Sequence, residues 1–326
     1  MNQIPLVSII VPVYNDYATI ELCLRTLLRQ TYPLKEIIVV DDGSTDMTSQ
    51  VIDMLSQSTS TLSVVTIKHS GSTVARNIGV NHAQGSIIFF GEGDAIYKSD
   101  YVENAVNMML RDPQLGGICL TGAPWMVKSS FITRSIDVEN RIQRKMLEDG
   151  TRDVFYAWIF QRKAIEAVGI FDKKLFQAED KDLFRRVKEA GYRIGLINGV
   201  NWRHKRDQNL WTFLKRNYYG GQTRILYLMK HRMYFHFVRA IGFLWFLIFC
   251  GLIGWFIPQA YWLFLIAIGS LLAYKLLYAL RYGWNIVKKK QHLLYLPWFT
   301  LLRHTSHAVG TTHGFLRFLL RKMRLR

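Results

Sequence analysis

The feature that most constrains this chain is an alternation of two apolar patterns over its first hundred residues. Continuous β-branched runs, such as LVSIIVPVY at 6–14, are typical of strands buried on both faces of a sheet. Between them lie helix-like segments, of which ATIELCLRTLLRQ places Ile20, Leu24 and Leu27 on one face. Strand and helix patterns that alternate in this way predict an α/β fold with an open, mostly parallel sheet.

The same periodicities assign most of the elements up to residue 194. We expect strands at 6–14, 34–44, 62–69 and 85–94, and helices at 18–30, 45–57, 73–83 and 101–111. Later elements are a strand followed by a short helix at 162–168, a turn at Gly169, and an amphipathic helix that Gly191 ends. The segment 115–165 has no clear period and is hard to assign.

Polar side chains follow three of the expected strands at the point where each strand ends. They are Tyr14, Asn15 and Asp16 after the first strand, Asp41 and Asp42 after the second, and Glu92 and Asp94 after the fourth. Because the carboxyl ends of parallel strands lie at the same edge of a sheet, these residues are expected to form one site. In the turn FFGEGDAIY, Gly91 and Gly93 would let both carboxylates face one cation.

The net charge of +18 belongs to the C-terminal part of the chain. Residues 201–326 hold 20 Lys and Arg and a single acid, Asp207. The same region contains the uncharged runs 240–257 and 260–274, each close to the roughly 20 residues that a helix needs to cross a bilayer. We therefore expect a domain at 1–232 and a membrane region at 233–326.

Within that membrane region we expect a hairpin of transmembrane helices at about 238–257 and 260–280, with its basic flanks in the cytoplasm. The basic segment that follows is interrupted by Pro297, Gly310 and Gly314, which predicts a pair of amphipathic helices on the membrane surface. A solvated basic tail is the alternative. Anionic lipids are the expected partner and nucleic acid is not, because the basic residues flank apolar runs and no nucleic-acid-binding motif is present.

The cysteines and the N-terminus indicate a cytoplasmic location for the first domain. Cys23, Cys119 and Cys250 are scattered and lack the spacing of a disulfide framework or a zinc site. The N-terminal apolar run lacks a basic segment before it and is broken by Pro12, so it is a poor signal peptide. The prediction is a multi-pass protein of the cell membrane with its first domain in the cytoplasm.

Six segments, taken in order, resemble the family 2 glycosyltransferases, which are inverting enzymes with a GT-A fold. They are SIIVPVYND, IIVVDDGSTD, ARNIGV, the acidic turn after IIFF, AEDKDLFRRV and NWRHKRD, and together they span roughly residues 5–230. The C-terminal part is similar to membrane members that build exopolysaccharide. The resemblance implies transfer of a sugar from a nucleotide-diphosphate sugar, with UDP as the expected nucleotide, to a lipid-linked glycan.

The resemblance also implies roles for the acidic residues. Asp180, with Glu179 beside it, would be the base that takes the proton of the acceptor hydroxyl, although an acidic helix N-terminus has the same composition. Asp94 would bind Mn²⁺ or Mg²⁺, and Glu92, which replaces the first aspartate of the family's Asp-x-Asp, would contact the ribose or the ion. His204 would be a third metal ligand, unless it is an ordinary solvated histidine.

The remaining candidates concern the nucleotide and the membrane. Asp42, with Asp41 adjacent, could accept a hydrogen bond from the base, and Arg76 could meet a phosphate or lie on the surface of its helix. The other members of the expected nucleotide site are Pro12, Tyr14, Asp16, Glu92 and Gly93. An amphipathic helix at about 208–230 would lie at the membrane surface.

Two alternatives remain open at this stage. In the first, the acceptor is a polyprenyl phosphate, which is already ionised and needs no base. In the second, the chain is a non-catalytic, nucleotide-binding subunit of a membrane glycan assembly. The departures at Glu92 and at Ala95, where the family usually has an aspartate, motivate the second alternative.

Overall fold

The chain forms two compact units, seen here in a computed structural model. The described residues are 4–124, 131–148, 158–175, 178–202, 209–233, 242, 245–246, 248–249, 251–253, 255–257, 261–285 and 291–323. The first unit, which we call the sheet unit, comprises Met1–Val127, Asp153–Leu175 and Glu179–Lys205. The second, the helical unit, comprises Lys128–Arg152, Phe176–Ala178 and Arg206–Arg326.

The sheet unit is built on an eight-stranded mixed sheet with the order β3-β2-β1-β4-β7-β6-β8-β5. The strands are β1 (Val7–Val13), β2 (Lys35–Asp41), β3 (Leu62–Thr66), β4 (Ile87–Phe90), β5 (Ala95–Tyr97), β6 (Leu115–Pro124), β7 (Ile159–Gln161) and β8 (Arg193–Trp202). β1 pairs in parallel with β2 and β4, and β2 with β3, as the sequence predicts. β7 runs antiparallel to β4 and β6, and β5 antiparallel to β8, so the sheet is mostly parallel but mixed.

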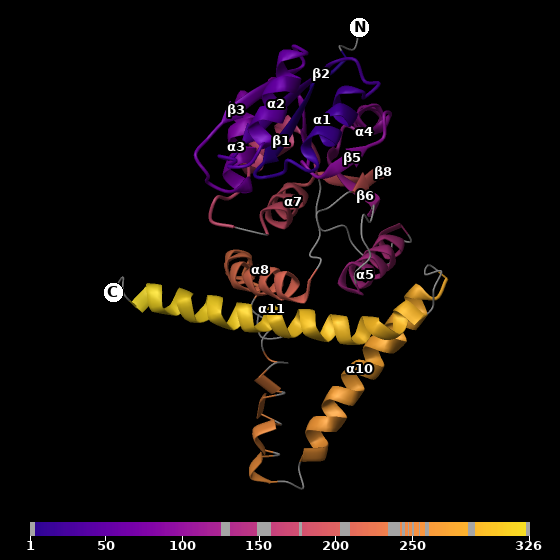
Figure 1. Ribbon diagram of the computed structural model, residues 1–326, viewed down its shortest axis with the longest axis vertical. Helices are drawn as coiled ribbons and strands as arrows, with labels where there is room; N and C mark the ends of the chain where they lie inside the picture. Colours follow the sequence, from indigo (N-terminus) through magenta and orange to yellow (C-terminus); the bar gives the residue numbers. More distant parts are fainter. Residues whose placement is uncertain are drawn as a thin grey trace. The chain divides into compact units, whose positions relative to one another are not determined.

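Helices pack around this sheet (Figure 1). They are α1 (Ile20–Leu28), α2 (Thr48–Gln57), α3 (Ser72–His82), α4 (Tyr101–Arg111), α6 (Arg162–Val168) and α7 (Glu179–Glu189). Each was expected from the sequence, with ends that differ by a few residues. Gly169 and Gly191 follow α6 and α7 with positive φ angles of 77° and 88°, which is the conformation that glycine adopts at the end of a helix.

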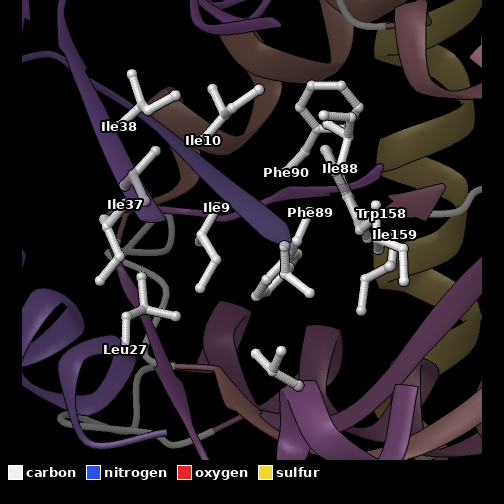
Figure 2. Close-up of a cluster of buried hydrophobic side chains, with 14 of the residues drawn as sticks. Ile9, Ile10, Leu27, Ile37, Ile38, Ile88, Phe89, Phe90, Trp158 and Ile159 are labelled. Carbon is white, nitrogen blue, oxygen red and sulfur yellow. The ribbon is translucent and has the colours of Figure 1, made fainter. Parts of the chain in front are cut away.

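The core of the sheet unit lies on both faces of the parallel strands (Figure 2). The register aligns three side chains on each face: Ile9, Ile37 and Phe89 on one, and Ile10, Ile38 and Phe90 on the other. All six are at most 1% exposed. Burial on both faces explains why these strands are continuous apolar runs, and each such side chain contributes about 1.5–3 kcal/mol to folding.

We expect Gly79→Val to lower the free energy of unfolding by about 1–3 kcal/mol, because it overpacks the core. Gly79 lies on the face of α3 that packs against β1, and a Cβ at this position would overlap the Ile10 side chain. Urea denaturation of the variant measures the effect. Asn81→Val introduces the same side chain at an exposed position of α3 and is the control. Equal stability of the two variants would contradict the close packing of α3 on β1.

The helical unit contains α5 (Phe131–Glu148), α8 (Leu210–Lys230), α10 (Tyr261–Gly283) and α11 (Gln291–Met323). A small apolar core joins these four helices. Its buried members include Ile142 of α5, Phe213 of α8, Ala279 of α10 and Phe299 of α11. α5 lies between β6 and β7 in the sequence but packs with the C-terminal helices. Arg303 of α11 forms an ion pair with Glu139 of α5.

α11 is one continuous helix, so the prediction that this segment forms a pair of helices is wrong. It runs through Pro297, Gly310 and Gly314 without a break. The two glycines face α8, which lies along α11 (Figure 1). A Cβ at Gly310 would overlap the carbonyl of Tyr218, and one at Gly314 would meet that of Gln222. These glycines therefore allow close helix packing rather than ending a helix.

Two further expectations concern the C-terminal part of the chain. Among the described residues, no helix has both the length and the apolar character needed to cross a membrane. α10 covers most of the second expected span, and much of 238–257 lies outside the described residues. The sequence also placed its domain boundary at residue 232, whereas α8 groups with the helical unit.

Candidate active site

The parallel strands bring the polar strand ends to one edge of the sheet. Val13 at the end of β1 is in register with Asp41 at the end of β2, and Ile10 is in register with Phe90 at the end of β4. The segments that follow, 14–16, 41–42 and 92–94, therefore leave the sheet side by side. This edge lies where the chain order reverses around β1, the position at which open α/β sheets bind ligands.

The acidic turn after β4 is held from two sides. The backbone N–H of Glu92 donates to the Tyr97 hydroxyl at 2.9 Å, and the thiol of Cys23 donates to the Glu92 carbonyl at 3.2 Å. Burial raises the pKa of Cys23, and the negative charges of Asp94, Asp16 and Glu92 raise it further. The three carboxylates are half-buried and concentrate negative charge around one turn.

Gly93 lies directly against Asp16. A Cβ at Gly93 would lie 3.2 Å from Oδ2 of Asp16, so the absence of a side chain leaves room for that carboxylate. Carboxylate oxygens are the ligands that Mg²⁺ and Mn²⁺ prefer, so this donor set fits a hard divalent cation. Among the described residues, no group of three or more His, Cys, Asp and Glu side chains is spaced to hold a metal by itself. His204 lies outside the described residues.

Asp41 and Asp42 are almost fully buried and hold the loops of this edge. The carboxylate of Asp42 accepts from the backbone N–H groups of Ser70 at 2.6 Å and Gly71 at 2.8 Å. That of Asp41 accepts from the backbone N–H of Ser44 at 2.9 Å and the Ser49 hydroxyl at 2.5 Å. Since Gly71 is the residue before α3, Asp42 ties the start of that helix to the edge of the sheet.

Arg76 of α3 brings the start of α7 toward the same edge. Its guanidinium forms an ion pair with Glu179, with 2.9 Å between Nη1 and Oε1, and both side chains are buried. Arg76 is therefore not an exposed residue on the surface of α3, and its side chain is not exposed at the edge of the sheet. Asp180, the residue after Glu179, lies in the first turn of α7 and accepts from the Lys181 N–H at 2.7 Å.

The environment of Asp180 suits proton transfer. Burial raises the pKa of its carboxyl, and the neighbouring charge of Glu179 raises it further, whereas Lys181 and Arg76 lower it. A carboxylate whose pKa is raised toward neutrality is a better general base. The sheet unit thus carries acidic groups in two different environments: the half-buried carboxylates clustered around the acidic turn, and the Asp180 carboxyl, whose pKa is raised.

Residues 8–169 match the family model described as Glycosyl transferase family 2. This region contains β1 to β4, the acidic turn, and α3. The chain carries a family 2 glycosyltransferase domain. Enzymes of this family generally invert the configuration of the transferred sugar, and they share the α/β architecture described above.

Relatives of this glycosyltransferase include proteins of glycan synthesis. Glycosyltransferase AglE of Haloferax volcanii is 27% identical over 254 residues, which cover 76% of this chain and 82% of AglE. The uncharacterized glycosyltransferase EpsJ of Bacillus subtilis is 32% identical over 211 residues, or 60% of each chain. The hyaluronan synthase of Pasteurella multocida is 28% identical over 59% of this chain and only 19% of its own length.

A solved structure shares the fold of the whole glycosyltransferase chain. The mannosyltransferase PcManGT from Pyrobaculum calidifontis, determined with GDP-Man and Mn²⁺, superposes with a TM-score of 0.61 at 20% identity. The match covers 95% of this chain and 88% of that one. At this identity the likeness shows a common fold alone.

One residue of the glycosyltransferase site is not among those that the sequence predicts. His69 follows β3 and stacks on Tyr14, with 4.0 Å between the ring centroids and 27° between the planes. Its Nδ1 lies 2.9 Å from Oδ2 of Asp42, and both rings are well exposed. Pro12, in contrast, is half-buried inside β1. The sequence did contain a signal for His69, which is the polar residue that ends the third expected strand. The predicted site used the ends of the first, second and fourth strands only.

Proposed function

We propose that this glycosyltransferase moves a sugar from a nucleotide-diphosphate sugar to the hydroxyl of a lipid-linked glycan, with inversion. The observation that carries the proposal is the pairing of two different acidic environments in one unit, the turn of Asp94 and the carboxyl of Asp180. Direct displacement with inversion needs both, because a leaving group gains charge while a hydroxyl loses a proton. A direct displacement of this kind needs only one carboxylate that acts as a base, which here would be Asp180.

The acidic turn would hold a divalent cation through Asp94 and Glu92, with Asp16 beside them. When bound, such an ion neutralises the negative charge that develops on the nucleotide diphosphate as it leaves. The protein's part is to keep the three carboxylates in place, through Cys23, Tyr97 and the side-chain-free position at Gly93. The Mn²⁺ in the PcManGT complex supports the use of a metal here.

The donor's base would lie against the platform of Tyr14 and His69. Aromatic rings that are exposed at a ligand-binding edge are suited to stacking, and the two rings here are already aligned. Asp41 and Asp42 would act mainly by holding the loops beside this platform, because their oxygens already accept hydrogen bonds from the backbone and from Ser49. We propose UDP as the nucleotide, with GDP as the competitor that the solved relative suggests.

Asp180 would remove the proton of the acceptor hydroxyl as that oxygen attacks the anomeric carbon. Its raised pKa favours proton capture, and it lies in the first turn of α7. Loss of activity is expected as the pH falls through this raised pKa, because the protonated carboxyl is no longer a base.

A panel of nucleotide sugars tests the proposal on the full-length chain. UDP and GDP binding are measured by calorimetry with and without Mn²⁺, and hydrolysis or transfer is followed for each candidate sugar. Tighter binding with Mn²⁺ together with turnover of at least one donor supports the proposal. Metal-dependent binding without turnover of any donor would favour the non-catalytic subunit instead.

Membrane attachment through the helical unit is the second part of the proposal, with the sheet unit in the cytoplasm. One face of α11 is packed in the small core, whereas another carries exposed apolar side chains: Tyr295, Trp298, Leu302, Val309 and Leu316. Such a helix is typical of a membrane interface, with basic residues for anionic lipids. The proposed hairpin anchor rests on the uncharged runs of the sequence.

Extraction of membranes that contain the full-length chain separates the two modes of attachment. We expect the chain to stay in the membrane pellet after both high salt and alkaline carbonate, because inserted helices resist both treatments. Release by carbonate would contradict the hairpin and leave α11 as the only attachment. Protease added from the cytoplasmic side should cleave the sheet unit, and protection would contradict its proposed location.

A further inference from the structure

Three side chains on one face of α3 contact the segment that leads into α7. The amide of Asn77 donates to the Phe171 carbonyl at 2.8 Å and accepts from the Phe171 N–H at 3.1 Å. The hydroxyl of Thr73 donates to the Leu175 carbonyl at 3.4 Å, and Arg76 pairs with Glu179. Thr73, Arg76 and Asn77 are each at most 7% exposed. They recur at helical spacing, so α3 presents them together.

The guanidinium of Arg76 is enclosed as well as paired. Its Cζ lies 5.0 Å from the centre of the Trp158 ring and 5.6 Å from that of Phe171. Within the described part of the chain, Nε of Arg76 and Oε2 of Glu179 are buried without a hydrogen-bond partner. This pair is therefore not optimised for stability, and a buried ion pair of this kind is better suited to defining one geometry.

We propose that the Thr73–Arg76–Asn77 face of α3 positions the first turn of α7, and with it Asp180, for proton transfer. The inference rests on the proposed function and assigns Arg76 and Glu179 a positioning role rather than contact with the donor. Arg76 is too enclosed to meet a diphosphate without breaking its pair with Glu179 and leaving that carboxylate buried alone. Such a break carries a large cost, since it leaves one charge uncompensated.

The part of α7 beyond its first turn is held by contacts of its own. The proposed positioning of the first turn can therefore be tested separately from the folding of the helix. Arg186 pairs with Asp182 at 2.8 Å and donates to the carbonyls of Val168, Gly169 and Ile170. Loss of the Arg76–Glu179 pair should therefore release the first turn while the rest of the helix stays in place. A displacement of about 1 Å at a reacting group is enough to lower a rate by roughly 100-fold.

Steady-state kinetics of Arg76→Met and Glu179→Gln test this proposal in the full-length enzyme. We expect kcat to fall by about 10–100-fold. The donor KM and the Kd of the nucleotide with Mn²⁺ should stay within about twofold, because neither side chain contacts the donor. Arg185→Met removes a half-buried arginine that pairs with Glu189 on the same helix, and it should leave kcat within about twofold.

The pH profile adds a signature that a purely structural role would not produce. Among the described residues, the charged groups that act on the pKa of Asp180 are Glu179, Lys181 and Arg76. Glu179→Gln removes a charge that raises the pKa of Asp180, so the acid limb of kcat should move to lower pH. Arg76→Met removes a charge that lowers it, so the limb should move to higher pH. Shifts in the same direction in both variants would overturn the assignment.

The double variant Arg76→Met/Glu179→Gln keeps the test valid if a single variant unfolds. It removes both buried charges, so its thermal unfolding midpoint should lie closer to wild type than that of the less stable single variant. Its kcat should stay low, because the first turn of α7 is still released. Two results would overturn the positioning role but not the proposed function. One is wild-type kcat in a folded double variant, and the other is a tenfold rise of the nucleotide Kd in any variant. An inactive wild-type enzyme would overturn the proposed function and this inference together.

Discussion

Asp180→Asn is expected to lower kcat by about 10²–10⁴-fold, the range that a general base contributes. The substitution keeps the size of the side chain but removes its capacity to take a proton from the acceptor hydroxyl. The donor KM should change little, because the base acts on the acceptor. Single-turnover transfer with saturating donor measures the effect, and Glu189→Gln, at an exposed position of α7, is the matched control.

The same variant separates two classes of acceptor. A polyprenyl phosphate is already ionised when it attacks, so an enzyme that uses it would retain much of its rate without Asp180. A small loss of kcat would therefore contradict a hydroxyl acceptor and favour the polyprenyl-phosphate alternative. A loss of several orders of magnitude, with the donor KM unchanged, excludes that alternative.

Asp94→Ala is expected to abolish the effect of Mn²⁺ on nucleotide binding and to lower kcat/KM by about 10³-fold. The physical reason is that removal of one carboxylate weakens the hold on a cation that would offset the charge of the leaving diphosphate. Calorimetric titration of UDP with and without Mn²⁺ measures the first effect, and transfer kinetics measure the second. Asp53→Ala removes an exposed carboxylate from α2 and should change neither quantity.

The outcome for Asp94 also tests the interpretation of the acidic turn as a whole. If metal-dependent binding of UDP survives in Asp94→Ala, the turn does not hold the cation through this residue. The cluster of Asp16, Glu92 and Asp94 would then be explained as a charged strand end that Cys23 and Tyr97 hold in place.

The sequence predicts the parallel half of the sheet well because each of its strands is buried on both faces. Such strands are apolar along their whole length, and the amphipathic helices between them have a clear 3.6-residue period. The other half was hard to assign for a physical reason. β5 and β7 have three residues each, which is too short for a period, and α5 packs in a different unit from the strands that flank it in sequence.

Some residues of the candidate site could be predicted from local sequence patterns, whereas others are brought together only by contacts between distant segments. Glu92 and Asp94 are recognisable because they directly follow a strand, and Asp180 because it begins an amphipathic helix. The stack of Tyr14 on His69 has no local pattern, since two separate loops bring the rings together. Pro297, Gly310 and Gly314 were interpreted as breaks because the sequence alone does not show that α8 packs against the two glycines.

The sequence by itself determined the α/β class, the acidic edge of the sheet and the division into a near-neutral and a basic part, because these depend on period, spacing and composition. Only the tertiary structure decided which side chain Arg76 pairs with. It lies 103 positions from Glu179 along the chain, and the partner of a charged side chain is set by which helices the sheet brings together. The motif predicts a phosphate ligand, whereas the structure pairs Arg76 with Glu179 and encloses its guanidinium between the rings of Trp158 and Phe171. The positioning role that we propose rests on these contacts.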